Sequence, residues 1–206
     1  MVRSQRDLSR ELSNIQLFEN PQFKLEQYET PAHIATEWIW EMASKGEVAG
    51  KIILYAGCGT GILGLGLLLM GARKVYFVDK DESAMKICID NHNKLKEAYE
   101  IGDAEFISHD ITLFDEQVDI VVQNPPFGTK EVHADKKFLE VAFKSAPIIY
   151  SMHKYSTKSF VEAICKDFGF TITDTIRYDF PIKAKYEFHL KPVKNIDVGL
   201  WRMEKD

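Results

Sequence analysis

Short apolar runs alternate with amphipathic segments through most of this chain. Beyond residue 50 these runs predict β-strands, because they are short and rich in β-branched and aromatic residues. They lie at residues 51–55, 74–78, 105–108, 119–123 and 148–151. Helical spacing of apolar residues predicts helices at 62–70, 82–95, 136–145 and 158–167. Strands that alternate with helices in this way predict a parallel, doubly wound α/β sheet.

Both ends of the chain depart from this alternation. Apolar runs at 170–178 and 195–201 predict two final strands that pair in antiparallel fashion. Residues 4–17 instead have helical spacing. Thr30 suits the N-cap of a second helix, with Pro31 at its first position. The N-terminal part is therefore predicted to be helical.

The composition is that of one ordinary globular domain. Of the 206 residues 45% are hydrophobic and 28% charged, so we predict a single domain, 1–206, in which residues 1–45 form a helical extension. No apolar run approaches the ~20 residues that a membrane span needs. Cys58, Cys88 and Cys165 form no CxxC pair, and the histidines lack metal-ligand spacing. We therefore expect no metal site, no disulfide framework and a cytoplasmic location.

The charge is distributed unevenly along the chain. The net charge is −5, which argues against a generally cationic nucleic-acid binder. Residues 1–129 carry 12 Lys and Arg against 20 Asp and Glu, whereas residues 130–194 carry 12 against 8. A local basic face could hold a phosphate backbone even on an acidic protein. The alternative is an ordinary solvated surface.

A glycine-rich segment, "YAGCGTGILGLG", follows the first of these predicted strands. Glycines permit a tight turn and a close approach of the backbone to a ligand, and the next helix offers free N–H groups. Gly59, Gly61 and Gly64, with Asp79 20 residues after Gly59, fit a dinucleotide-binding pattern. Gly57, Gly59 and Gly61 also fit the GxGxG loop of S-adenosylmethionine-dependent methyltransferases. The loop by itself leaves both kinds of ligand open.

Two carboxylates follow the second and third predicted strands. Asp79 can accept hydrogen bonds from both hydroxyls of a ribose, whereas the adjacent Asp81 and Glu82 suit the cap of the next helix. Asp110 can accept a hydrogen bond from an adenine amino group. The alternative for Asp110 is an Asx turn.

The segment "DIVVQNPPFGTK" ends the fourth predicted strand abruptly. Proline fixes its own φ and holds the preceding residue extended, so Asn124 is aimed out of the sheet. Its side-chain oxygen and the Pro125 carbonyl can accept hydrogen bonds from one planar amino group, and Phe127 can stack on the ring that carries it. The alternative is a proline-rich turn, Pro125 and Pro126, with a core phenylalanine.

This arrangement suits methylation of an amine. Acceptors placed where the hydrogens move as nitrogen becomes tetrahedral stabilise the transition state more than the planar ground state. A base within a nucleic-acid helix must be extruded to reach such a site. A dehydrogenase has no use for this element, so the motif favours the methyltransferase interpretation of the glycine loop.

Taken together, these motifs resemble the methyltransferase-like five family, small-subunit ribosomal RNA adenine-N6 methyltransferases of class I. The resemblance covers residues 25–191 and rests on LEQYETPAHIA, GCGTGIL, VDKD, NPPFGTK, YSMHKYST and KYEFHLK. It implies a doubly wound Rossmann-like class I methyltransferase fold, a mostly parallel seven-stranded sheet with an antiparallel last strand. It also implies S-adenosyl-L-methionine as cofactor and ribosomal RNA of the small subunit as partner.

The resemblance assigns roles to individual residues. The implied cofactor contacts are Gln27, Tyr28, Thr30, Gly57, Cys58, Gly59, Gly61, Asp79, Asp110, Ile111 and Asn124. Those that hold the target adenine are Asn124, Pro125, Pro126 and Phe127. The implied RNA contacts are Lys130, His153, Lys154, His189 and Lys191. For each of the last group, the alternative is a solvated surface side chain.

Three questions stay open at this stage. Tyr55 stands where the family usually has an acid, which puts cofactor affinity in doubt. Eukaryotic members work with a small zinc-binding activator protein that pairs along a sheet edge, for which residues 105–108 are the natural place. Finally, the substrate could be RNA guanine-N2 or protein glutamine-N5, or the chain could be a ribosome-assembly factor that binds the cofactor without catalysis.

Overall fold

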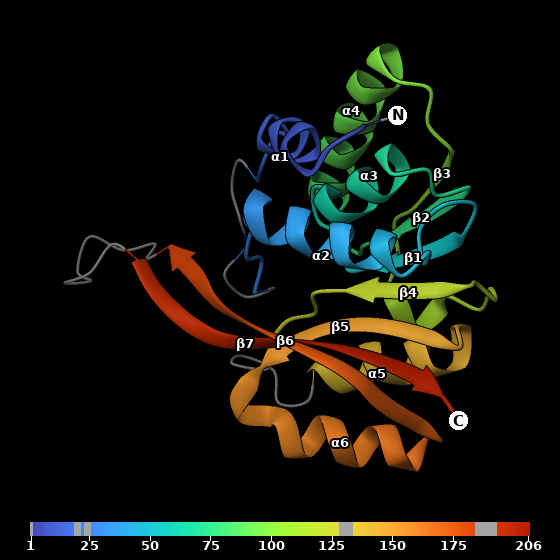
Figure 1. Cartoon of the computed structure of the whole chain (residues 1–206), viewed down its shortest axis with the longest axis vertical. Coiled ribbons are helices and arrows are strands. Elements are labelled where there is room, and N and C mark those ends of the chain that lie inside the picture. Colours follow the sequence, from blue (N-terminus) through green and yellow to red (C-terminus); the bar gives the residue numbers. More distant parts are fainter. Residues whose placement is uncertain (1, 19–21, 23–25, 128–133, 184–192) are drawn as a thin grey trace.

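One sheet of seven strands forms the centre of the molecule (Figure 1). The computed structural model describes residues 2–18, 22, 26–127, 134–183 and 193–206. The strands are ordered β3-β2-β1-β4-β5-β7-β6 across the sheet. Their bounds are β1 Ile52–Ala56, β2 Lys74–Val78, β3 Asp103–Ile107, β4 Ile120–Gln123, β5 Ile148–Lys154, β6 Phe170–Lys183 and β7 Val193–Lys205.

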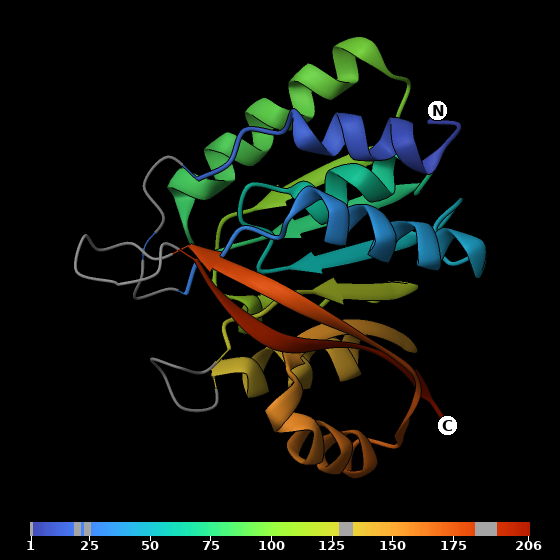
Figure 2. The same ribbon diagram turned by 60° about the vertical axis from the view of Figure 1, so that its left-hand side comes forward.

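Strands β1 to β5 pair in parallel, and β7 runs antiparallel to both β5 and β6. The predicted α/β class, the mostly parallel sheet and the antiparallel final pair are therefore confirmed. The last two strands and β5 are longer than predicted, and β5 continues to Lys154. Figures 1 and 2 show that β6 and β7 extend well beyond the neighbouring strands.

Helices cover both faces of the sheet, as the doubly wound pattern requires. One hydrophobic cluster joins the sheet to α1, α2, α3 and α4, and a second joins the other face to α5 and α6. The bounds are α1 Gln5–Ser13, α2 Ala32–Ser44, α3 Ile62–Leu69, α4 Glu82–Ala98, α5 Ala134–Ser145 and α6 Lys158–Asp167, with 3-10 turns η2 Ile111–Leu113 and η3 Tyr155–Thr157. In the part of the chain that the structure describes, no helix is both long and apolar enough to cross a membrane.

Two helix starts test the predicted caps. Asp81 is the N-cap of α4 and accepts hydrogen bonds from the backbone N–H of Ser83 and Ala84 at 2.9 and 3.4 Å, as predicted. Thr30 is not the cap of α2: Pro31 occupies the N-cap position, with ψ of 141°, and no side chain caps the helix. The helix therefore begins one residue later than predicted, and the Thr30 hydroxyl is available for another contact.

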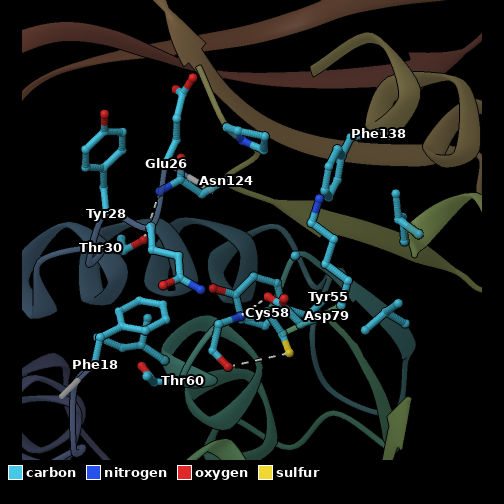
Figure 3. Close-up of a pocket in the computed structure, with 18 of the residues that line it drawn as sticks. Phe18, Glu26, Tyr28, Thr30, Tyr55, Cys58, Thr60, Asp79, Asn124 and Phe138 are labelled. Atoms are coloured by element: carbon cyan, nitrogen blue, oxygen red, sulfur yellow. Dashed lines mark hydrogen bonds between the residues drawn. The ribbon is translucent and has the colours of Figure 1, made fainter. Parts of the chain in front are cut away.

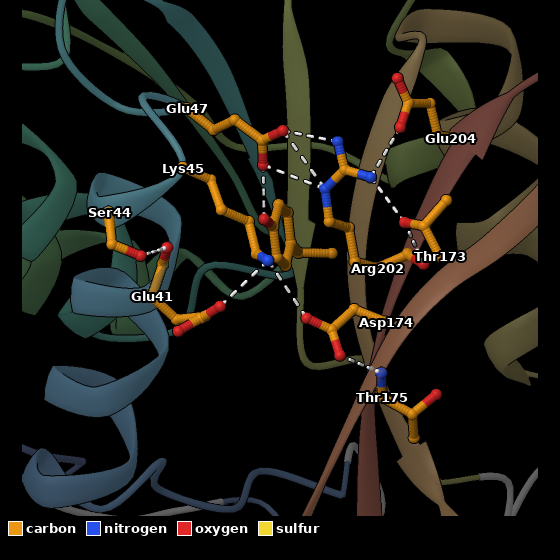
Figure 4. A network of polar contacts seen from close by, with 10 residues as sticks. Glu41, Ser44, Lys45, Glu47, Thr173, Asp174, Thr175, Arg202 and Glu204 are labelled. Carbon is orange, nitrogen blue, oxygen red and sulfur yellow. Dashed lines mark hydrogen bonds and ion pairs between the residues drawn. The ribbon is translucent and has the colours of Figure 1, made fainter.

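A buried ionic network ties the loop before β1 to the far strands of the sheet (Figure 4). The Arg202 guanidinium on β7 donates to both carboxylate oxygens of Glu47 at 2.5 to 3.2 Å, and the Tyr150 hydroxyl on β5 donates to the same carboxylate at 2.5 Å. The side chains of Arg202 and Glu47 are only 10% and 12% exposed. This pairing holds Glu47 against strands that lie about 100 or more residues further along the chain.

Glu47 is ionised in this network at neutral pH. Burial by itself would raise the pKa of Glu47, but hydrogen bonds from Arg202 and Tyr150 outweigh it and leave that pKa below its usual value. A carboxyl group with a lowered pKa stabilises the fold above its unfolded-state pKa and loses this contribution as pH falls through the folded-state pKa. The network is therefore expected to weaken in acid.

Replacing Arg202 with Met should lower the free energy of unfolding by about 3 kcal/mol, because Glu47 would keep a buried charge without its partner. Urea unfolding at neutral pH, followed by circular dichroism, measures this change. Arg177→Met is the matched control: it removes an arginine from an ion pair with Asp197 in which both side chains are exposed, and its effect should be much smaller. Adding Glu47→Gln to Arg202→Met should restore part of the lost stability, and a failure to do so would contradict the buried-charge explanation.

Candidate functional site

A pocket of about 160 Å³ opens beyond the carboxyl ends of β1, β2 and β4 (Figure 3). This is the position where doubly wound sheets bind their ligands. The predicted cofactor residues that line it are Gln27, Tyr28, Thr30, Gly57, Cys58, Gly59, Asp79, Asp110, Ile111 and Asn124. Gly61 does not line the pocket; it is the N-cap of α3. The structure thus brings together residues from five separate segments of the sequence.

The glycine loop forms the floor of the pocket, and two of its glycines lie under aromatic rings. Gly57 and Gly59 have φ of +66° and +52°, in the left-handed region that favours glycine. A Cβ at Gly59 would lie 2.8 Å from the ring of Phe18, and one at Gly57 would lie 3.0 Å from the ring of Phe138. The loop therefore needs glycine at both positions for backbone conformation and for space.

Asp79 is fixed by the backbone beside this loop. Its carboxylate accepts hydrogen bonds from the N–H of Gly59 at 2.8 Å and of Asp81 at 2.9 Å. Burial raises the pKa of Asp79, and these two hydrogen bonds only partly oppose that rise. A carboxylate has about four lone-pair sites, so Asp79 can accept further hydrogen bonds from a ligand in the pocket.

Asp110 combines the two roles that the sequence left open, a carboxylate at the ligand site and a turn residue. It lines the pocket, and its Oδ1 also accepts hydrogen bonds from the N–H and hydroxyl of Thr112 at 3.0 and 2.8 Å, which makes it the N-cap of η2. These bonds from Thr112 lower the pKa of Asp110, which keeps it ionised. The turn thus orients an ionised carboxylate at the pocket.

The N-terminal extension forms one wall of the pocket and is held there by two polar contacts. Asn91 on α4 accepts from the N–H of Gln16 at 3.0 Å and donates to its carbonyl at 2.9 Å. The Gln27 amide donates to Asp81 at 2.6 Å. Together these contacts hold Phe18 and the residues around Gln27 against the cofactor side of the sheet.

Several pocket residues were missed by the sequence reasoning. Phe18 and Phe138 come from the N-terminal extension and α5, and no local pattern connects either with the glycine loop. Glu26 also lines the pocket, although it is only 6% exposed. Its φ of +50° is uncommon for a residue with a side chain. That backbone conformation could have been found only from the structure.

Asn124 is oriented by the hydroxyl of Thr30, which does not cap α2. Its Nδ2 donates to the Thr30 Oγ1 at 3.0 Å. In the described part of the chain its Oδ1 is buried and has no hydrogen-bond partner. A buried acceptor without a partner costs free energy, about 1–3 kcal/mol. The amide of this pocket residue therefore has an acceptor that no other described group uses.

The two prolines and the phenylalanine of NPPF are placed differently from one another. Pro126 lines the pocket. Phe127 is 7% exposed and belongs to the hydrophobic core, with its ring stacked against Tyr28 and edge-on to Phe180, both at centroid distances of 6.0 Å. The structure thus gives Phe127 the core position that the sequence offered as an alternative, directly beside the pocket residue Tyr28.

The predicted RNA contacts are only partly described. Lys130, His189 and Lys191 lie outside the described residues. Lys154 is half-buried at the end of β5. His153 is 1% exposed, and its ring lies against Ser151, Asp135 and Trp201. The expected surface position of His153 is therefore corrected, because both faces of β5 are covered and all residues from Ile149 to His153 are buried.

Tyr55 is a neutral part of the pocket. The side chain is 3% exposed and lies beside Cys58 and Asp79 (Figure 3). Burial raises the pKa of Tyr55 well above its usual value, so the phenol keeps its proton. No negative charge replaces the missing acid at this position. The bond between Gly59 and Asp79 organises the loop here.

Comparisons with known proteins agree with this architecture. The methyltransferase small domain family matches residues 34–149. The rRNA N(6)-adenosine-methyltransferase Mettl5 of Drosophila melanogaster is 34% identical, over 97% of this chain and 95% of its own. The crystal structure of PH1948 from Pyrococcus horikoshii superposes with a TM-score of 0.89 and 35% identity, covering 100% of this chain and 99% of that one.

A more distant structure has the same fold with the cofactor in place. It is the magnesium protoporphyrin IX methyltransferase of Synechocystis PCC 6803 with bound S-adenosylmethionine, at a TM-score of 0.66 and 16% identity, over 84% of this chain and 78% of that one. The chain belongs to the methyltransferase small domain family and, within it, to the family of rRNA N6-adenosine methyltransferases that contains Mettl5.

Proposed function

We propose that this chain transfers a methyl group from S-adenosylmethionine to the N6 amine of an adenine in small-subunit ribosomal RNA, with the base flipped into the NPPF pocket. The observation that carries this proposal is the unpartnered Oδ1 of Asn124. An acceptor held at the end of a strand, beside a nucleotide-type pocket, suits an amino group that has to be held while it reacts. The relationship to an rRNA N(6)-adenosine-methyltransferase is the reason for proposing adenine as the target base and ribosomal RNA as the substrate.

The pocket residues fit the cofactor chemically. The glycine loop brings no side chain of its own into the pocket at Gly57 and Gly59, where the rings of Phe138 and Phe18 already lie close. Asp79 would accept from the ribose hydroxyls, and Asp110 from the adenine amino group. Gln27, Tyr28 and Thr30 would cover the methionine end. The bound cofactor supplies an electrophilic methyl group attached to a sulfonium.

Asn124 would act on the substrate amine. Because Thr30 holds the Nδ2 side of the amide, Oδ1 is kept facing the position of the incoming amine. An exocyclic amine is planar and a poor nucleophile until its lone pair leaves the ring. Hydrogen bonds to Oδ1 and to the Pro125 carbonyl favour the tetrahedral nitrogen, so they stabilise the transition state more than the ground state. Positioning then supplies much of the remaining rate.

Phe127 needs one change before it can stack on a base. One face of its ring is covered by Tyr28, which comes from the N-terminal extension. The target base would have to displace the Tyr28 ring from this face of Phe127 or stack beside it. We therefore assign Tyr28 a part in base entry as well as in cofactor binding, and the extension becomes a wall common to both ligands.

The choice of ribosomal RNA over the other amine substrates rests on relatives. The Drosophila melanogaster Mettl5, named as an rRNA N(6)-adenosine-methyltransferase, is similar over 97% of this chain. The basic excess in residues 130–194 agrees with an RNA-facing side, and a cytoplasmic location remains a prediction.

An activator protein would have a place to bind at β3. This strand is one edge of the sheet and pairs only with β2 among the described strands. Asp103 and Glu105 are exposed, and the remaining residues of the strand are half-buried. An unpaired edge of this kind is a template for addition of a strand from a partner. We propose that a small zinc-binding activator pairs along β3.

Replacing Asn124 with Ala should lower the turnover number by about 100-fold or more while cofactor affinity stays nearly unchanged, because one acceptor for the transition state is lost. Methyl transfer from labelled S-adenosylmethionine and calorimetric binding of the cofactor measure the two effects. Asn14→Ala is the matched control, since Asn14 is an exposed amide at the end of α1. A variant that lost cofactor affinity but kept its methylation rate would contradict the role proposed for Asn124.

Removal of this enzyme from its cell should abolish one N6-methyladenosine in small-subunit ribosomal RNA. Nucleoside analysis by mass spectrometry of RNA from a deletion strain measures this loss. A loss of N2-methylguanosine or of a methylated protein glutamine would instead support one of the alternative substrates. Cofactor binding with no change in any methylated product would support the assembly factor without catalysis.

Pairing with the activator should slow hydrogen exchange along β3. The amides of Asp103–Ile107 are expected to gain protection when the cognate activator is added. The reason is that the partner strand would form hydrogen bonds with the amides that face solvent. β6, at the opposite edge of the sheet, is the internal control and should be unchanged. No complex with the activator, together with full activity of the chain alone, would refute this proposal.

A further inference from the structure

A chain of buried polar side chains lies directly behind Asn124. Gln123 and Ser151 are 0% exposed, His153 is 1% exposed and Asp135 is 8% exposed. Gln123 Nε2 donates to Ser151 Oγ at 2.9 Å, and Ser151 Oγ lies 2.6 Å from His153 Nε2. On the other side of the ring, His153 Nδ1 lies 3.4 Å from Asp135 Oδ2, although within the described residues it has no hydrogen-bond partner.

The strand register brings these groups together. Gln123 is the last residue of β4 and pairs with Ser151 of β5. Ser151 and His153 are two residues apart on β5, so both point to the face that α5 covers. Asp135 lies in the first turn of α5. The chain thus joins β4, β5 and α5, at the level where β4 delivers Asn124.

Polar residues are unusual at these positions, because the core around them is apolar. Val121 and Ile149, on the same face of the same strands, belong to the hydrophobic cluster under α5 and α6. Within the described residues, Gln123 Oε1 is buried and has no hydrogen-bond partner. A leucine or methionine at this place would avoid that cost. The network therefore calls for an explanation other than stability.

The network is arranged to fix the end of β4. The Gln123 amide can adopt one orientation only while Ser151 accepts from its nitrogen. Ser151 is in turn held by a ring that Asp135 and Trp201 restrain from α5 and β7. Gln123 immediately precedes Asn124, and Pro125 leaves Asn124 little freedom of its own. Any rotation of the strand end would therefore move the Asn124 Oδ1.

The same network reaches the cofactor side of the pocket. Phe138, on the turn of α5 that follows Asp135, lies against Gly57 of the glycine loop. The contact between His153 and Asp135 thus connects the helix that touches the cofactor loop with the strand end that carries Asn124. One set of buried contacts would thus fix the position of Asn124 relative to the glycine loop.

We propose that Ser151 and His153 are positioning residues for methyl transfer, which hold Asn124 in its reactive orientation through Gln123. This inference rests on the proposed function of Asn124. Neither side chain touches a ligand, since both are buried below the pocket. Their loss should change the rate of the reaction rather than the binding of the cofactor.

The test uses Ser151→Ala in the full chain, with methyl transfer from labelled S-adenosylmethionine to isolated small-subunit ribosomal RNA. We expect kcat to fall about tenfold, because a small misplacement of a reacting group is costly, with cofactor affinity and KM for RNA changed less than about twofold. A kcat within about twofold of the parent would overturn the proposal. An equal loss of cofactor affinity would also overturn it.

A matched pair separates the hydroxyl from the packing. Ser151→Thr and Ser151→Val add nearly the same volume, and only the first keeps the hydroxyl group. We expect the Thr variant to retain several-fold more kcat than the Val variant at equal melting temperature. Equal rates in the two variants would mean that Ser151 acts only by packing. If the Ser151 variants do not fold, His153→Gln is tested in the same assays, with the same split between kcat and cofactor affinity expected.

A double-variant cycle with Asn124→Ala distinguishes failure of this inference from failure of the proposed function. If Ser151 acts through Asn124, adding Ser151→Ala to Asn124→Ala should cause almost no further loss of rate. Independent, additive losses would refute positioning through Asn124. Full activity of Asn124→Ala alone would refute the proposed function, whatever Ser151→Ala does.

Discussion

The hydrogen bond from Asn124 to Thr30 is the contact on which the rest of the site depends. It joins residues 94 positions apart in the sequence, one at the end of β4 and one in the N-terminal extension. Because Thr30 takes the Nδ2 side of the amide, the Oδ1 of this pocket residue is left without a partner among the described residues. The extension is thereby attached to the same residue that we propose holds the substrate amine.

Two other polar networks in the molecule use buried polarity in opposite ways. Around Arg202 and Glu47 the opposite charges are paired at close range, so their burial is compensated and the sheet is tied to the loop before β1. Behind Asn124, the chain from Gln123 to Asp135 leaves two buried polar atoms, Gln123 Oε1 and His153 Nδ1, without a hydrogen-bond partner among the described residues. The first network serves stability, whereas the second holds a strand end in place at a cost to stability.

The predictions that succeeded rest on short-range patterns. Short apolar runs rich in β-branched and aromatic residues identified the strands, and Asp81 was recognised as a cap because capping depends on residues within one helical turn. The errors have a common cause. Thr30 was expected to cap α2 and His153 to face RNA, but one hydroxyl turned to Asn124 and one ring turned into the core. Both outcomes depend on neighbours distant in the sequence.

The sequence by itself determined the doubly wound sheet, the glycine loop with Asp79 at its edge, and the strand that stops at Asn124. These follow from periodicity, backbone freedom and the fixed φ of proline, which act over a few residues. Only the tertiary structure decided that the side-chain acceptor of Asn124 stays unpaired, that Phe18 and Phe138 close on the loop, and that His153 joins Gln123 through Ser151. Such contacts form when separate elements pack together, and side-chain direction then depends on the partner rather than on the local sequence.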